Sequence, residues 1–169
     1  MTLSMYQASV PVFLRGLRNL SGVLAKGAAS AAERRIDPAV FLTARLAPDM
    51  FALARQVQIA SDHAKGASAR LAGVEVPKFE DNEASFEELQ QRLNRVAEFV
   101  QTFDAHKIDG SEERVIVLPI GGRTMTFRGQ TYLLQFALPN FYFHCTTTYA
   151  ILRHNGVSVG KRDFIGSGD

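Results

Sequence analysis

Histidine is the side chain best suited to hold a metal ion or move a proton near neutral pH, and two of the four in this chain share one apolar stretch. The stretch PNFYFHCTTTYAILRHNG contains His144 and His154 and reads as a helix. Ten residues of helix span about 15 Å, so these two imidazoles cannot bind the same ion. We therefore expect His154 to cap the helix C-terminus and His144 to need a partner from another helix.

Cys145 follows His144 directly, and on a helix the two side chains point about 100° apart. They cannot act as a nucleophile and its base. Cys145 is the one cysteine of the chain, which rules out an intramolecular disulfide and fits a reducing cytoplasm. The glycines of GVSVGKR, residues 156–162, lack the spacing and the preceding strand of a phosphate loop. No complete catalytic signature is present, so whether the chain is an enzyme stays open.

The candidate partners of His144 are Asp62 and His63, because the interior of a helical bundle can bring ligands from facing helices together. A helical wheel places His63 about a quarter turn from the centre of its apolar stripe. It places Asp62 nearly opposite, on the face that carries Arg55 and Lys65. The alternatives are that Asp62 pairs with Lys65, that His63 is a half-exposed residue, and that a hydroxyl or carbonyl satisfies a buried His144.

Aromatic side chains crowd around His144 and could line a small-molecule pocket, although an aromatic-rich helix is more often simply core. Residues 141–143 are all aromatic and cover most of the helix circumference, so this helix is central or is covered by a hairpin or a second subunit. This predicts a homodimer. The candidate pocket residues are Thr148, Tyr149, Tyr132 and Gln58.

Helices must position these residues. Apolar residues at three- and four-residue steps predict long helices over 6–24, 50–71 and 86–103. A fourth helical region begins near residue 130, breaks at Pro139 and resumes to Asn155. The expected boundaries are Pro11 in the first turn of the first helix, Asp37 capping a short connecting helix, Pro48 opening the second long helix, Gly73 ending it, and Ser85 with Glu88 forming a capping box.

The segments outside these helical regions are predicted to form a hairpin, a loop and an extended tail. The stretch ERVIVLPIGGRTMTFRG has β-branched residues on both sides of Gly121 and Gly122, which predicts a small hairpin before the last helix. We expect His106 to lie in a loop. The tail after Gly156 is predicted to be extended, with Phe164 and Ile165 holding it against the bundle.

Composition limits the class of protein. With 169 residues, 46% of them hydrophobic, the chain is expected to form one domain, residues 1–169. A near balance of 19 basic and 17 acidic side chains makes nucleic acid an unexpected partner. The N-terminus lacks the order of a secretory signal, and no apolar run could span a membrane, so we expect a soluble cytoplasmic protein.

Three blocks carry a resemblance to a known family: SMYQASVPVFLRGLRNLSGVL, RLAPDMFALARQVQIASDHAKGASARLAG and PNFYFHCTTTYAILRHNGVSVGKRDFIG. Together they resemble a bacterial and fungal family of proteins without an assigned function, in the DinB/YfiT-like helical-bundle superfamily. The resemblance covers nearly the whole chain. It implies an all-α, up-down-down-up four-helix bundle, often dimeric, around a place where many superfamily members bind nickel or zinc.

In that superfamily one histidine of the second helix and two histidines four residues apart on the fourth hold the metal. Carried over, the fourth-helix pair falls at His144 and Thr148, and the second-helix ligand near Asp62 or His63; the family pattern keeps Asp62. Threonine is a weak ligand for either metal. Two functions follow: a degenerate DinB-like module that binds a small ligand or a partner, or, as the alternative, a divalent-metal-dependent transferase or hydrolase.

Overall fold

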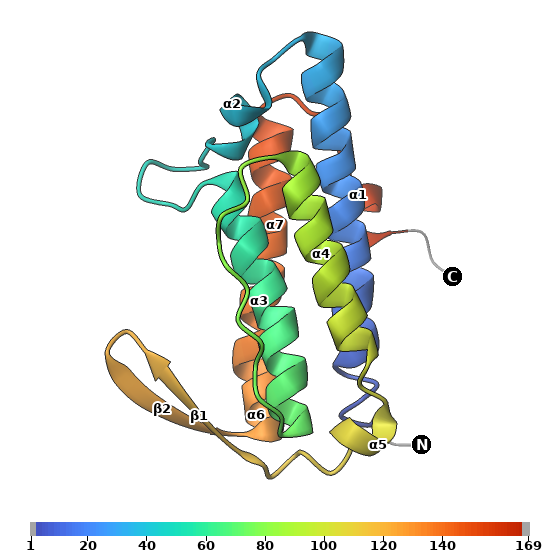
Figure 1. Cartoon of the computed structure of the whole chain (residues 1–169), viewed down its shortest axis with the longest axis vertical. Coiled ribbons are helices and arrows are strands. Elements are labelled where there is room, and N and C mark those ends of the chain that lie inside the picture. Colours follow the sequence, from blue (N-terminus) through green and yellow to red (C-terminus); the bar gives the residue numbers. More distant parts are fainter. Residues whose placement is uncertain (1–2, 167–169) are drawn as a thin grey trace.

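Four long helices dominate the computed structural model, which describes residues 3–166 (Figure 1). They are α1 (Val10–Arg34), α3 (Leu53–Ala72), α4 (Phe86–Gln101) and α7 (Leu138–His154). In Figure 1, α1 and α7 run upward, whereas α3 and α4 run downward. Because α3 and α4 are parallel, the segment between them returns along the whole length of α3.

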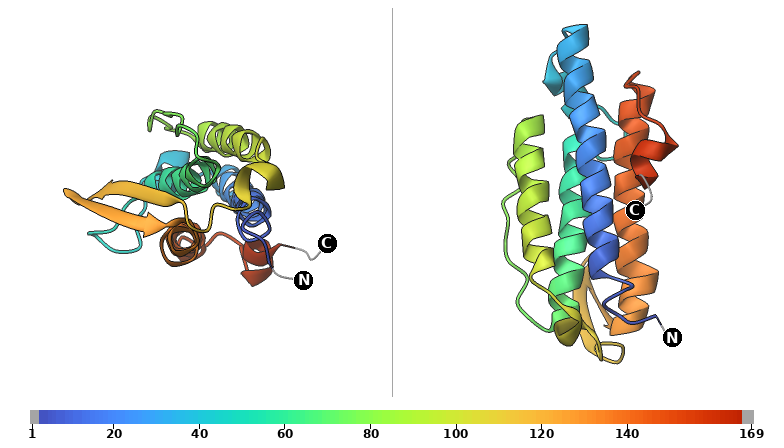
Figure 2. Two further views of the ribbon diagram at one scale, coloured as in Figure 1. Left: turned by 90° about the horizontal axis from the view of Figure 1, so that it is seen from below. Right: turned by 90° about the vertical axis from the view of Figure 1, so that its right-hand side faces the viewer.

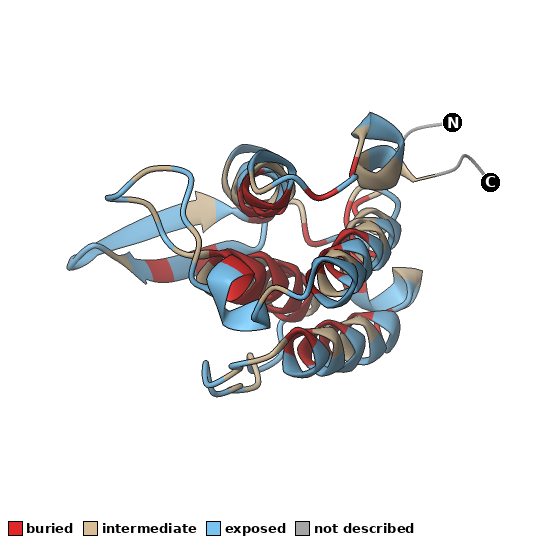
Figure 3. Cartoon of the chain, turned by 90° about the horizontal axis from the view of Figure 1, so that it is seen from above, coloured by how far each residue is buried: buried red, intermediate tan, exposed pale blue. Residues whose placement is uncertain are grey.

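The long helices pack in a ring, in which α3 lies against α7 and α4, and α1 lies against α4 and α7 (Figure 2). Buried residues lie mainly where the helices face one another (Figure 3). The apolar stripes predicted from the sequence supply this core, with fully buried side chains such as Phe13, Leu53, Leu93 and Phe141. Burial of such large apolar side chains is the main force holding the helices together.

Short elements lie at the ends and along the sides of the bundle (Figures 1 and 2). They are α2 (Pro38–Leu42), α5 (Ala105–Ile108), α6 (Gly129–Tyr132) and α8 (Lys161–Ile165), and a hairpin of β1 (Val115–Ile120) and β2 (Arg123–Arg128). The hairpin is antiparallel, with Val115 opposite Arg128 and Ile120 opposite Arg123. Gly121 and Gly122 form its turn at φ values of 56° and 77°, which glycine adopts without strain. The chain is thus mainly helical and has a hairpin before its last long helix, as the sequence predicts.

Most predicted helix boundaries are confirmed. Pro11 lies in the first turn of α1, and Gly73 ends α3 in the left-handed conformation. The Asp37 side chain accepts a hydrogen bond from Ala39 N at 2.9 Å. The Ser85 hydroxyl caps α4 by accepting a hydrogen bond from Glu88 N. The Glu88 carboxylate accepts from Ala84 N instead of from Ser85 N, so the capping box is shifted by one residue.

Several local predictions are wrong. Helix α3 begins at Leu53 and not at Pro48, because residues 47–50 form a turn in which Met50 N donates to Ala47 O. His106 lies on the one-turn helix α5, which the Asp104 side chain caps. The tail forms the short helix α8 where an extended segment was expected, although Phe164 does pack against the bundle through Tyr149.

Pro139 does not break the last helical region as the sequence predicts. Helix α6 continues through a π-helical turn, η1 (Leu133–Ala137), into α7, and the Leu138 N–H bonds to the carbonyl of Leu133, five residues earlier. A proline in a regular α-helix lacks one donor and clashes with the carbonyl four residues before it. The wider turn accommodates the proline, so the chain stays helical from Gly129 to His154.

None of the helices formed by residues 3–166 is both long and apolar enough to cross a membrane.

Candidate functional site

His144 and Gln56 form the polar contact between α7 and α3. The Nδ1 atom of His144 lies 2.6 Å from Gln56 Oε1, and the residue as a whole is only 8% exposed. Gln56 Nε2 donates to the carbonyl of Phe51 at 3.0 Å, which leaves Oε1 to act as the acceptor. His144 therefore carries its proton on Nδ1 and keeps the lone pair of Nε2.

His63 stacks on His144, with ring centroids 5.9 Å apart and planes 14° apart. Phe136 of η1 also contacts His63 in an edge-type arrangement, with ring centroids 5.8 Å apart and planes 63° apart. Burial, and then the neighbouring His144, lower the pKa of His63 to about 4. Burial, and then Arg55, also lowers the pKa of His144. Both imidazoles are therefore neutral at pH 7.

A recess of about 260 Å³ opens beside His63, between α3, the hairpin and the α6–η1 segment. Its walls are partly aromatic, and the Tyr132 hydroxyl accepts a hydrogen bond from Arg70 Nη1 at 3.2 Å. Within residues 3–166, neither ring nitrogen of His63 has a hydrogen-bond partner. The recess thus offers one N–H and one lone pair from a neutral imidazole. It is lined by Asp62, His63, Arg70, Leu118, Pro119, Ile120, Tyr132 and Phe136.

Asp62 belongs to an ionic cluster instead of to the histidine pair. Its Oδ1 accepts from Lys65 Nζ at 2.8 Å, which is the i,i+3 pair expected as an alternative from the sequence, and from Arg92 Nη2 at 3.0 Å. Arg92 is 3% exposed and also binds Asp81 at 2.9 Å and Glu83 at 3.0 Å. These contacts hold the segment between α3 and α4 against both helices.

The predicted pocket residues lie in different surroundings. Tyr132 lines the recess, whereas Thr148 is buried and donates its hydroxyl to the carbonyl of His144 at 2.9 Å. Tyr149 packs against Phe164 on the far side of α7. Gln58 donates to Glu83 at 2.8 Å and so belongs to the ionic cluster. The structure therefore pairs His63 with His144 and places Tyr132 in the recess beside His63, whereas Tyr149 and Gln58 lie elsewhere.

The donor set does not fit a nickel or zinc site of the superfamily type. Such sites use three or more ligands from histidine, cysteine or carboxylate groups. Across residues 3–166, no three His, Cys, Asp or Glu side chains are grouped so as to hold a metal ion. Asp62 is bound to two cations, and Thr148 is bonded to its own helix. The lone pair of an imidazole nitrogen also lies in the plane of its ring. Two stacked, nearly parallel rings therefore cannot both direct a lone pair at one metal ion.

Sequence reasoning missed two residues of this region. Gln56 precedes His63 by seven residues, so both lie on one helix face, and this spacing could have identified it. Arg92 lies between Leu89 and Leu93, inside the apolar stripe of its helix. A charged residue at such a position indicates a buried ion pair.

Comparisons with known proteins agree with this fold. No curated protein matches the sequence. A crystal structure of a DinB family member protein from Shewanella denitrificans is similar, with 40% identity and a TM-score of 0.89 over 96% of this chain and 92% of that one. Residues 5–165 match the family described as Domain of unknown function (DUF1993). The chain belongs to the DUF1993 family, and its fold is DinB-like.

Proposed function

We propose that this chain is a DinB-like module, in the up-down-down-up order of that superfamily, that binds a small molecule in the cytoplasm and has lost the superfamily's metal site. The observation that carries the proposal is the neutral His63 imidazole, which borders the recess without a hydrogen-bond partner in residues 3–166. A half-buried polar group of this kind is most stable when a ligand or an ordered water satisfies it.

The chemistry of the recess indicates the ligand class. His63 offers one donor and one acceptor, and Phe136 and Tyr132 offer aromatic faces. A small aromatic molecule with a hydroxyl group would stack on the rings and bond to the imidazole nitrogen. His144 does not line the recess but stacks behind His63, and Gln56 fixes its orientation. Their role in the proposal is to position His63.

The proposal is tested with phenol and anisole, which differ by one methyl group on the oxygen. We expect phenol to shift the amide NMR signals around His63 and Tyr132 in a saturable way, and anisole to bind several-fold more weakly because it cannot donate. A His63→Leu variant should lose the preference for phenol. A His106→Gln variant, changed at an exposed histidine, should keep it. Equal binding of both probes to the wild type would refute the proposal.

The alternative function is a divalent-metal-dependent transferase or hydrolase of the DinB-like type. The observation that favours it is the Gln56–His144 hydrogen bond, since histidines that bind metals usually donate their other N–H to such a partner. Metal analysis of untagged protein incubated with nickel or zinc separates the two functions. About one equivalent of metal, lost in His144→Ala, would support the enzyme; far below one equivalent would support the ligand-binding module.

We also propose that the chain forms a homodimer. The supporting observation is Phe143, which projects from α7 with 55% of its surface exposed. Burial of such a side chain by a second copy would remove a large apolar surface from water.

A further inference from the structure

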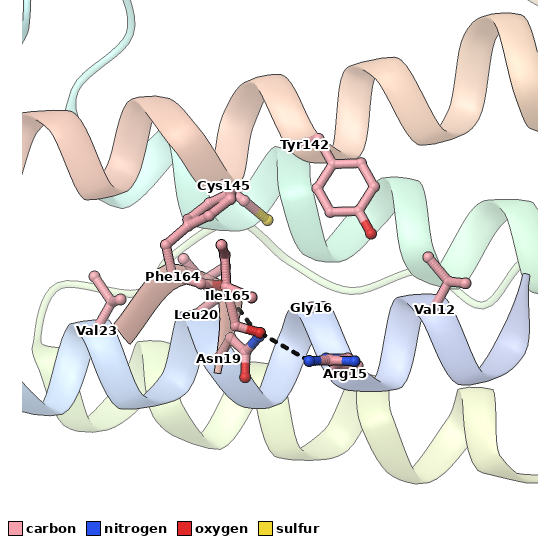
Figure 4. A pocket seen from close by; sticks show the side chains of 10 residues that line it. All are labelled: Val12, Arg15, Gly16, Asn19, Leu20, Val23, Tyr142, Cys145, Phe164 and Ile165. Atoms are coloured by element: carbon pink, nitrogen blue, oxygen red, sulfur yellow. Dashed lines mark hydrogen bonds between the residues drawn. The ribbon is translucent and has the colours of Figure 1, made fainter. Parts of the chain in front are cut away.

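A second cavity lies on the opposite side of α7, between α1, α7 and α8 (Figure 4). Its volume of about 370 Å³ falls in the range of roughly 300 to 1,000 Å³ that is typical of small-molecule sites. Cys145 faces this cavity, whereas its neighbour His144 faces α3, so the cavity is separate from the His63 recess. It is lined by Val12, Arg15, Gly16, Asn19, Leu20, Val23, Tyr142, Cys145, Phe164 and Ile165.

Helix α8 forms one wall, and specific contacts hold it in place. Asn19 Nδ2 donates to the carbonyls of Phe164 and Ile165 at 3.1 and 2.8 Å, and Arg15 Nη2 donates to Ile165 at 3.3 Å. Lys26 forms an ion pair with Asp163 at 2.7 Å. Side chains of α1 therefore hold this wall in place.

The floor of the cavity depends on Gly16. A Cβ atom at this position would overlap the ring of Phe141, so the glycine lets that ring lie directly against α1. Cys145 and Leu20 are buried and line the same space. An apolar interior of this kind favours an apolar ligand body.

Polar groups of the cavity are restricted to a few positions. Arg15 is the one charged side chain among its described lining residues, and it is exposed to solvent. Tyr142 projects from α7 toward α1 on the same side (Figure 4). Burial raises the pKa of Tyr142, so its hydroxyl remains a donor at neutral pH. A guanidinium and a phenol at an apolar cavity match the charge and geometry of a carboxylate.

We infer that this cavity binds a small amphipathic carboxylate, with its apolar body between α1 and α7 and its carboxylate at Arg15 and Tyr142. The inference does not depend on the function proposed for the His63 recess. A single charge on an otherwise apolar wall favours a monocarboxylate over a more polar anion. Other occupants, such as a neutral lipid or a second copy of the chain, are outcomes of the test below.

The test compares octanoate with octan-1-ol, which have the same chain length and differ in charge. We expect octanoate, below its micelle concentration, to bind saturably in calorimetry. The amide NMR signals of the protein that shift on binding should be those around Leu20, Cys145 and Phe164. Arg15→Gln should weaken octanoate about tenfold and leave octan-1-ol unchanged. Arg18→Gln is the matched control, because Arg18 lies on the same helix but lines a different surface recess.

Two further variants keep the result interpretable. Val12→Trp should block octanoate from the cavity, and because the chain has no tryptophan its fluorescence also reports whether the fold is intact. His63→Leu should bind octanoate as the wild type does, which separates this site from the recess. Equal loss in Arg15→Gln and Arg18→Gln, preference for octan-1-ol, or no binding because a second copy covers the cavity would each overturn the inference.

Discussion

His63 is neutral in the folded protein, and this makes the stability of the fold depend on pH. Its pKa is 6.5 as an unperturbed group and about 4 in the structure, with burial as the main cause. Between these values the unfolded chain binds a proton that the folded chain does not. Stability is therefore complete above pH 6.5 and is lost as the pH falls toward 4.

We predict that the free energy of unfolding decreases by about 2 to 3 kcal/mol between pH 7 and pH 4.5 because of this histidine. Urea denaturation at the two pH values measures the change. In His63→Leu the decrease should shrink by that amount, and in His106→Gln it should not. An unchanged pH dependence in His63→Leu would mean that the imidazole is not held neutral by burial.

At this scale the sequence predicted some placements well. The helical wheel favoured His63 over Asp62, and the structure does pair His63 with His144 while Asp62 binds Lys65 and Arg92. The wheel could not show that Gln56 would fix the His144 tautomer, because this depends on the side-chain rotamer and on the carbonyl of Phe51. Contacts between helices need the packing distance, which one sequence does not contain.

Helix α1 approaches α7 closely at one glycine and is open to solvent at another. Gly16 meets the Phe141 ring, and that ring packs edge-on against Phe13 at 5.2 Å. Gly22 is exposed, and a methyl group added there would meet no other atom within 4 Å. The same substitution therefore tests packing at one position and helix propensity at the other.

We predict that Gly16→Ala lowers the free energy of unfolding by about 1 to 3 kcal/mol, because the new methyl group forces the Phe141 ring out of place. Gly22→Ala should raise it by about 0.5 to 1 kcal/mol, since alanine favours the helix. Chemical denaturation of both variants provides the measurement. Similar effects at the two positions would show that the α1–α7 contact is not tight at Gly16.

The segment between α3 and α4 is held by charge instead of by a helix or strand. Arg92 donates to Glu83, to the Glu80 carbonyl and to Ser61 Oγ, and pairs with Asp62 and Asp81. The cation that holds the segment is Arg92, which is buried within the apolar stripe of α4.

We predict that Arg92→Met costs about 2 to 4 kcal/mol of stability, because it leaves several carboxylates without their shared cation. Hydrogen exchange of residues 74–85 should also become faster. Arg95→Met is the control: its exposed guanidinium lies 3.8 Å from the centre of the Phe79 ring, a contact worth less than about 1 kcal/mol. Equal effects of the two changes would contradict a special role for Arg92.

Over the whole molecule, the periodic apolar stripes predicted the long helices because burial of one face is enough to define them. The ends of elements were less predictable. Pro48 resembles a helix start and Pro139 a helix break, yet the first lies in a turn and the second follows a π-helical turn. Local signals of this kind are overridden when a neighbouring turn can accommodate the proline.

The proposed dimer is tested at this scale by light scattering. We predict a mass about twice the 18.6 kDa of one chain for the wild type, and a shift toward one chain in Phe143→Ser, because the exposed ring would no longer be buried between copies. Val117→Ser on the hairpin, which replaces a side chain of similar exposure, is the control. A wild-type mass of one chain would exclude the dimer.

The π-helical turn η1 changes the angular phase between the two ends of the last long helical stretch. In an uninterrupted α-helix, Tyr132 and His144 would lie about 120° apart around the axis. The extra residue in η1 reduces that angle to about 20°, which directs Tyr132 to the side on which His63 meets His144. Conversion of η1 to regular α-helical turns, with no residue deleted, would therefore rotate the aromatic wall away from the imidazoles while leaving every residue of the recess in the chain.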